Sequence, residues 1–105
     1  MNYDDMPAGL ELDALVAERV MGYVSTLLGY TYGYKLVDVP PFSADIASAW
    51  KVVENIHARG LIIRVSNGDG DSFDCDILGT EGHVSAETWP LAICRAALKA
   101  MEVFE

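Results

Sequence analysis

The spacing of apolar and polar residues divides the chain into helical and extended segments. Residues 10–23 carry apolar side chains every three or four positions with charged residues between them, which predicts an amphipathic helix. A second helix is expected over residues 44–58 with Ser43 as its N-cap. A third is expected to follow its N-cap, Thr88, and to reach about residue 104.

The second predicted helix should bury one stripe of side chains. Its apolar residues fall at helical spacing, so one line of them is expected to face the core. Gly60 suits the position just beyond the helix, where a left-handed backbone conformation ends it. The expected stripe comprises Ile46, Trp50, Val53 and either Ile56 or His57.

Three short extended segments lie between the second and third predicted helices. They cover residues 61–65, 72–78 and 83–87, and the turns between them are rich in glycine. The first turn, 67–70, reads Asn-Gly-Asp-Gly, a strong hairpin signal because these residues accept positive φ angles. The middle segment alternates cleanly, which predicts one buried face and one wet face. Phe73, Cys75 and Ile77 fall on one face, and Ser72, Asp74 and Asp76 on the other.

Together these segments predict an α+β domain covering residues 1–105. Three helices are expected to pack against a three-stranded antiparallel meander, and a short fourth strand can form near residues 35–39. Residues 43–105 then run in the order helix, three strands, helix. Double-stranded-RNA-binding domains share that order, but they contact phosphates through basic loops, and the corresponding turn here carries Asp69 and Asp71.

The composition narrows the function classes. The chain has 105 residues, of which 51% are hydrophobic, enough to build a core, so disorder is excluded. Seven basic residues against sixteen acidic ones give a formal net charge of −9. This charge argues against nucleic acid and against an anionic membrane surface, because both require clustered Lys and Arg.

The cysteines and the N-terminal residues indicate the compartment. Cys75 and Cys94 have no metal-ligand spacing and lie in apolar segments, which predicts buried, reduced thiols. The first residues are acidic where a signal peptide would be basic, and no apolar run is long enough to span a bilayer. A cytosolic location in the host cell is therefore expected.

The candidate chemical groups favour neither a metal nor a catalytic site. Residues 67–74 resemble the start of a calcium loop, but Leu78 occupies the position of the bidentate Glu, and a hairpin explains the same residues. Asp74 and Asp76 are interpreted as part of a solvent-exposed strand face. His57 and His83 belong to no local catalytic signature. No enzyme, cofactor or metal is predicted.

An aromatic stretch is the most distinctive segment. Tyr30, Tyr32 and Tyr34 could line one side of an extended chain, where their rings would suit a planar ligand or a partner surface. The alternative is an edge strand or a packed loop whose tyrosines cover the core. The candidate ligand-binding residues are Tyr30, Tyr32, Tyr34, Lys35, Phe42, Trp50, Arg64, Trp89 and Arg95.

Three blocks of sequence carry a family resemblance. They begin at Glu11-Leu12-Asp13-Ala14, at Pro40-Pro41-Phe42-Ser43 and at Ala86-Glu87-Thr88-Trp89, in that order along the chain. Together they resemble the phage ABA sandwich domain family, small proteins of bacteriophages and prophages. The resemblance implies an α/β/α-type sandwich and a phage origin, and it supplies no catalytic residues. Residues 29–39 depart from the family pattern.

The resulting functional hypothesis is a non-enzymatic phage or prophage accessory protein. It would counter host defence by sequestering a small nucleotide-type immune signal, with phosphate contacts from basic side chains and from the helix N-termini at Ser43 and Thr88. The alternative is an acidic module that binds and inhibits a host or phage protein. A weak metal-dependent hydrolase is the third hypothesis, and a homo-oligomer is compatible with all three. The basic candidates are Lys35, Lys51, Arg59, Arg64 and Arg95.

Overall fold

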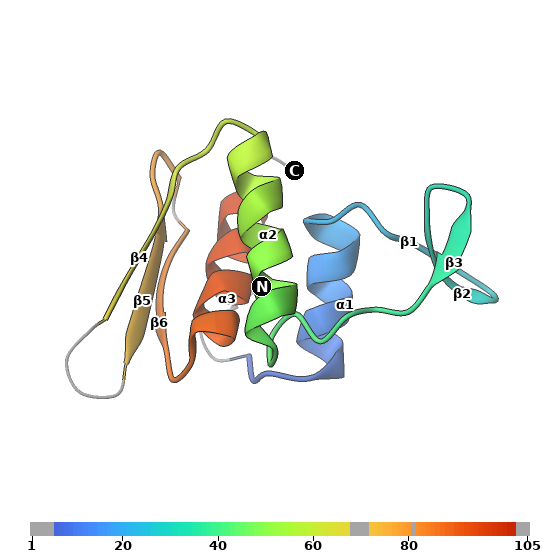
Figure 1. The fold of residues 1–105 in the computed structure, drawn as a ribbon, viewed down its shortest axis with the longest axis horizontal. Helices are drawn as coiled ribbons and strands as arrows, with labels where there is room; N and C mark the ends of the chain where they lie inside the picture. The colour runs from blue at the N-terminus through green and yellow to red at the C-terminus, as the bar shows by residue number, and fades with distance from the viewer. Residues whose placement is uncertain (1–5, 68–71, 81, 103–105) are drawn as a thin grey trace.

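Helices occupy the middle of the molecule, between two antiparallel sheets (Figure 1). A computed structural model describes residues 6–67, 72–80 and 82–102. The α+β class and the order helix, three strands, helix after residue 43 are confirmed. The helices are α1 (Leu10–Arg19), α2 (Ile46–Ala58) and α3 (Trp89–Glu102); one sheet holds β1 (Val24–Thr26), β2 (Gly29–Tyr32) and β3 (Lys35–Val37), and the other holds β4 (Ile63–Asn67), β5 (Phe73–Ile77) and β6 (Gly82–Ala86).

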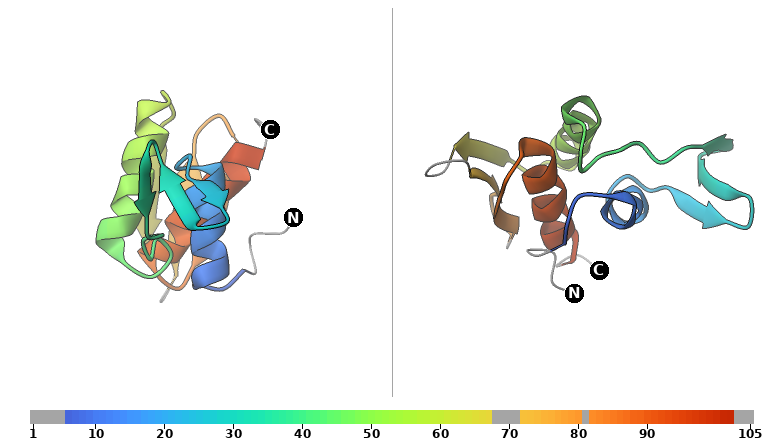
Figure 2. Two further views of the ribbon diagram at one scale, coloured as in Figure 1. Left: turned by 90° about the vertical axis from the view of Figure 1, so that its right-hand side faces the viewer. Right: turned by 90° about the horizontal axis from the view of Figure 1, so that it is seen from below.

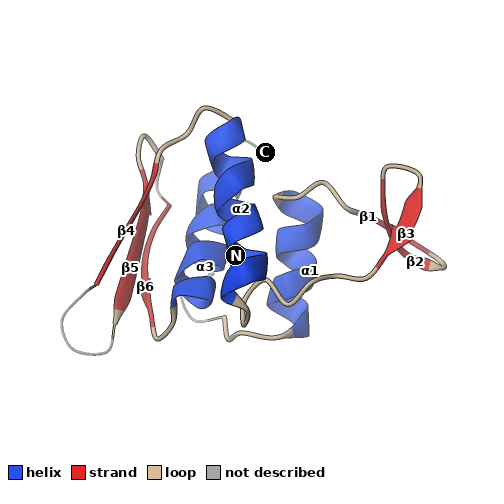
Figure 3. Cartoon of the chain, viewed as in Figure 1, coloured by secondary structure: helices blue, strands red, loops and turns tan. Residues whose placement is uncertain are grey.

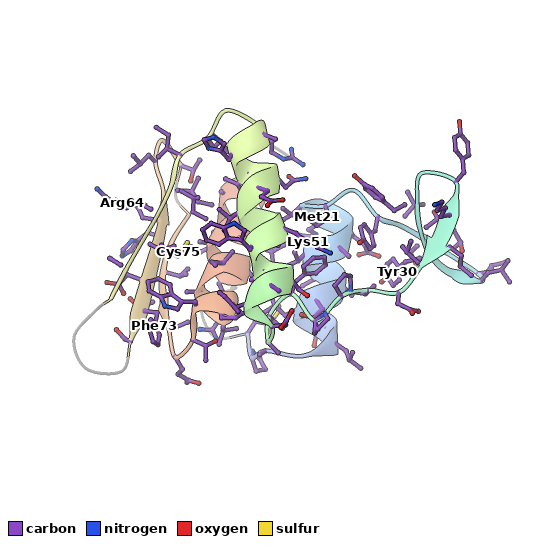
Figure 4. The ribbon with its side chains drawn as sticks, viewed as in Figure 1. Met21, Tyr30, Lys51, Arg64, Phe73 and Cys75 are labelled. Atoms are coloured by element: carbon purple, nitrogen blue, oxygen red, sulfur yellow. The ribbon has the colours of Figure 1, made fainter. Side chains whose placement is uncertain are left out.

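The core lies between the β4–β6 sheet and the helices. Helix α3 covers β5 and β6, α2 lies beside α3, and α1 packs on the far side of α3 (Figure 2). Cys75 and Ile77 are fully buried while Asp74 and Asp76 are only partly covered, so the predicted alternation of β5 is confirmed. Figure 4 shows Cys75 on the helix side of the sheet and Arg64 pointing away from it.

Two helix boundaries differ from the prediction. Helix α1 ends at Arg19 rather than near residue 23, and Gly22, at φ +82°, then turns the chain away. Helix α2 begins at Ile46 because Asp45, not Ser43, is its N-cap and accepts the backbone N–H of Ser48 at 2.9 Å.

Ser43 has a tertiary role instead of a capping role. It is fully buried, and both its N–H and its hydroxyl donate to Asp13 Oδ1, at 2.8 and 2.6 Å. Its hydroxyl oxygen also accepts the N–H of Gly9 at 3.0 Å. This cluster fastens the start of α1 to the segment that leads into α2.

The predicted buried stripe of α2 is confirmed at Val53 and Ile56 but is wrong at its start. Ile46 and Trp50 are 51% and 52% exposed. Helix α2 turns its smaller residues towards its neighbours in the fold. The three-stranded sheet ends at β4, so no further strand of the described chain covers the outer side of α2. The buried face comprises Ser48, Ala49, Val52, Val53 and Ile56.

The strands of the meander lie close to their predicted positions. Strand β5 loses only one residue at each end, whereas β4 begins two residues later than expected and includes Asn67. Asn67 pairs with Phe73, the last pair of the β4–β5 ladder. The predicted Asn-Gly-Asp-Gly turn and the calcium-like loop fall mainly on residues 68–71, outside the described residues.

The largest departure is the second sheet, where a loop with one short strand was predicted. Residues 24–37, called the β-arm below, form a complete meander in which β2 pairs with both β1 and β3. Strand β3 exists within the predicted residues 35–39, but it joins the β-arm and not the β4–β6 sheet. Figure 3 shows the β-arm set apart from the helices and joined to them by two coil segments.

Both cysteines are buried free thiols, as predicted. Burial, with a smaller contribution from Asp76, raises the pKa of the Cys75 thiol from about 9 to about 12, and burial raises that of Cys94 as well. Neither thiol is therefore an activated nucleophile.

The thiols should make the protein less stable in base. Unfolded thiols ionise near pH 9 while the folded ones stay protonated, so the free energy of unfolding should fall as pH rises from about 9 towards 12, by about 1.4 kcal/mol per thiol and pH unit. Urea denaturation at pH 8 and at pH 10.5 measures this loss. The double variant Cys75→Ala/Cys94→Ala should show a clearly smaller loss, and an equal loss would contradict the assignment.

Candidate functional site: an apolar groove beside an edge strand

An apolar groove runs between α2 and β4, and it is called the α2–β4 groove below. Its main part has a volume of about 400 Å³, and a second hollow of about 170 Å³ shares Trp50 and Val65 with it. Ligand sites in proteins commonly have volumes of 300–1,000 Å³ and mostly apolar walls. The lining residues are Ile46, Trp50, Val53, Glu54, His57, Ile62, Ile63, Val65, Trp89 and Ile93.

The groove exists because α2 extends beyond the edge of the sheet. Strand β4 is the edge strand, and α3 covers the two other strands, so the outer side of α2 has no strand beneath it. Trp50 projects from that side and remains half-exposed. One more strand beside β4 would cover it.

The free edge of β4 faces the same region. Leu78 N–H donates to Ile62 O at 2.9 Å across the β4–β5 ladder. Because hydrogen-bonded and non-bonded pairs alternate in an antiparallel ladder, the N–H and C=O groups of Ile63 and Val65 point to the open edge. The side chains of these two residues line the groove. The open backbone donors and acceptors of β4 therefore lie beside the apolar α2–β4 groove.

The polar groups of the groove lie on α2. Glu54 and His57 are the only titratable residues in its lining, and Trp50 lies one turn before them. On the opposite face of β4, Arg64 donates to Asp76 Oδ2 at 2.9 Å and therefore points away from the groove.

Two of the predicted ligand residues meet in this groove. Trp50 and Trp89 both line the smaller hollow, and the Trp89 ring lies 4.8 Å from that of Phe73. Phe42 lies elsewhere, fully buried in the core with its ring 6.4 Å from Tyr23. Arg95 is turned inward, where it donates to Met6 O at 2.6 and 2.9 Å.

The three predicted tyrosines do not form one stack. Tyr30 and Tyr32 share the face of β2 that turns towards the helices: Tyr30 Oη donates to Glu18 Oε1 at 3.3 Å, and the ring of Tyr32 lies 5.2 Å from that of Tyr23 (Figure 4). Tyr34 lies in the β2–β3 turn, fully exposed, and Lys35 follows it in β3.

Several basic side chains are used by the protein itself. Arg59 donates to Val20 O at 2.8 Å and to Asn55 Oδ1 at 2.9 Å, and Lys99 donates to His83 O at 3.1 Å. Arg64 and Arg95 are engaged as well, so these four side chains are not free to hold a phosphate.

The described residues also contain no group of three or more His, Cys, Asp or Glu side chains that could hold a metal ion. Asp74 and Asp76 are each engaged by a neighbour, since Ser85 Oγ donates to Asp74 and Arg64 to Asp76. Within the same residues, no helix has the length and apolar character needed to cross a membrane.

Sequence reasoning missed the β4 half of the groove. Ile62, Ile63 and Val65 were expected to be strand residues, but no pattern showed which helix lies beside their edge. A signal was present in Ile46 and Trp50, two large apolar residues one turn apart on the side of α2 away from its alanine and valine face.

Comparisons with known proteins agree with the fold. The profile of the phage ABA sandwich domain matches residues 14–98. A crystal structure of a phage protein from Bacillus cereus superposes with a TM-score of 0.69 at 26% sequence identity, covering 90% of this chain and 96% of that chain. None of the curated proteins matches.

Proposed function

This chain belongs to the phage ABA sandwich domain family, and on that basis we propose that it is a non-enzymatic phage or prophage accessory protein that binds an extended segment of a host or phage protein in the host cytosol. The observation that carries the proposal is the open edge of β4 beside the α2–β4 groove. The proposal takes up the alternative hypothesis from the sequence, an inhibitory protein-binding module, and adds a binding surface and a binding mode to it.

The backbone of β4 supplies the first half of the binding mode. An extended segment beside an open sheet edge forms main-chain hydrogen bonds without regard to its sequence, and pockets for its alternate side chains then give specificity. Ile63 and Val65 offer outward N–H and C=O groups for those bonds. The partner would become the fourth strand of the β4–β6 sheet.

The groove supplies the second half. Every second side chain of an added strand would point towards α2 and enter the trough at Trp50, Val53 and Ile46. Apolar side chains are favoured there because the trough is almost entirely hydrocarbon. Glu54 in the lining favours a basic or hydrogen-bond-donating residue at the facing position of the partner segment.

Selection from a random peptide library displayed on yeast tests the proposal. We expect enriched peptides to alternate apolar and polar residues, and to lose at least tenfold in affinity for Trp50→Glu. The matched control is Leu10→Glu, an exposed leucine at the start of α1, which should bind them unchanged. Enriched peptides without alternation, or equal binding to both variants, would contradict the proposal.

Sequestration of a nucleotide-type immune signal has less support from this geometry. The rings of Trp50 and Trp89 could stack on a base, but the groove lining contains Glu54 and no Lys or Arg to hold a phosphate. Thermal unfolding with cyclic and linear nucleotides distinguishes the two functions. We expect no shift of the midpoint; stabilisation that disappears in Trp50→Ala would favour sequestration.

A further inference from the structure

We propose that the β-arm is a self-association surface, on which two copies of this chain pack arm against arm. The proposal does not depend on the function of the α2–β4 groove, since the two surfaces lie at opposite ends of the molecule (Figures 1 and 2). It rests on four features of residues 24–37: their separation from the core, their apolar outer face, an unusual turn and their lack of negative charge.

The β-arm does little for the fold of its own chain. It extends from the helices along the longest axis of the molecule, and its three strands pack mainly against one another. The described links to the body are the Tyr30–Glu18 hydrogen bond and the ring contact between Tyr32 and Tyr23. A small sheet with few contacts to the body leaves its apolar side chains in water, and a second protein surface could cover them.

The outer face of the β-arm is apolar. Antiparallel pairing sets Val24, Thr31 and Leu36 side by side across the three strands, on the face opposite Tyr30 and Tyr32. Val24 and Leu36 are about 60% exposed, at 59% and 62%. The side that faces away from the body is therefore the side that could bury apolar surface in an assembly.

The tip of the β-arm reinforces this conclusion. Leu27 and Leu28 form the two-residue β1–β2 turn and are essentially fully exposed. Tight hairpin turns favour Asn and Gly with positive φ angles, but neither leucine has a positive φ. Two leucines at such a tip serve no purpose in the turn itself, whereas they would fill hollows on a second protein surface.

The charge distribution selects a second copy as the partner. The chain has a net charge of −9, so most faces of two copies repel each other. Residues 24–37 carry a single charge, Lys35, and no carboxylate. The β-arm is thus a long exposed segment at which two copies can meet without bringing acidic groups together.

The exposed apolar side chains of the β-arm can contribute to a dimer interface. Stable interfaces bury about 800 Å² on each partner. Tyr32 is turned towards Tyr23 and is not counted among them. The large apolar side chains exposed on the outer face and in the two turns, which supply part of such an area, are Val24, Leu27, Leu28, Tyr34 and Leu36.

Sedimentation velocity over a range of protein concentrations tests the proposal. We expect a monomer–dimer equilibrium that the double variant Leu27→Ser/Leu28→Ser weakens at least tenfold. The variant should keep its circular dichroism spectrum, because neither leucine contacts the core. Raising NaCl from about 20 mM to about 500 mM should strengthen the dimer, because salt screens the repulsion between the acidic bodies.

Two controls separate this interface from the others. Leu10→Ser, an equally exposed leucine outside the β-arm, and Trp50→Glu in the groove should leave the dissociation constant unchanged. A chain that stays monomeric up to about 1 mM, or a dimer that survives the leucine variant, would overturn the proposal. A dimer lost in Trp50→Glu would instead place the second copy in the groove.

Discussion

Replacing Phe42 with alanine is expected to lower the free energy of unfolding by about 3–5 kcal/mol. Phe42 lies in the segment that enters α2, its ring is completely buried in the core cluster, and it meets Tyr23 edge-on. Its removal loses the free energy gained by transferring an aromatic ring from water into the core. It also leaves a cavity that the closely packed surroundings fill only in part. Urea denaturation followed by circular dichroism measures the loss.

Tyr34→Ala is the matched control for this variant. Tyr34 was grouped with Phe42 as a candidate ligand residue, but its side chain is fully exposed in the β2–β3 turn. Its truncation should change the stability by less than about 0.5 kcal/mol. Similar losses for both variants would show that Phe42 does not occupy the core.

Replacing Asp13 with alanine should cost about 2–4 kcal/mol. Asp13 is 4% exposed, and its Oδ1 accepts two hydrogen bonds from Ser43. The alanine variant leaves the N–H of Ser43 buried without an acceptor, and an unsatisfied buried donor carries its full desolvation cost. Chemical denaturation of the variant and the parent protein gives the difference directly.

The conservative variant and a surface variant define the origin of this loss. Asp13→Asn keeps an acceptor oxygen at the same position and should lose less than the alanine variant. Glu11→Ala removes an exposed carboxylate from the same helix and should be nearly neutral. If Glu11→Ala costs as much as Asp13→Ala, the effect belongs to the helix and not to the bond with Ser43.

The elements that could be predicted are those whose signals are local. The alternation in β5 predicted correctly that Cys75 and Ile77 point inward. Alternate residues of a strand lie on the same face of the sheet, whichever strands it pairs with. The predicted start of α2 was wrong because Ser43 and Asp45 are both good N-cap residues. Distant contacts made the choice: the Ser43 hydroxyl oxygen accepts the N–H of Gly9 while Ser43 donates to Asp13, thirty residues away, so Asp45 is left to cap the helix.

The β-arm and the groove could not be predicted because both depend on which segments are neighbours. Nothing in residues 35–37 indicates which sheet their strand will join. Trp50 fits a helical stripe by its spacing, and its exposure follows only from the fact that the sheet stops at β4. Such relations are set by the assembled layers and leave no periodic signal in the chain.

The fastening at the base of the β-arm has an evolutionary consequence. Where the arm leaves α1, Tyr23 N–H donates to Ala17 O at 2.8 Å, and where the chain returns, Ser43 is held by Asp13. Between these two anchors, residues 24–37 can lengthen, shorten or change sequence at little cost to the core, since loop closure depends only weakly on length. The β-arm can therefore change in evolution while the helices and the β4–β6 sheet stay the same.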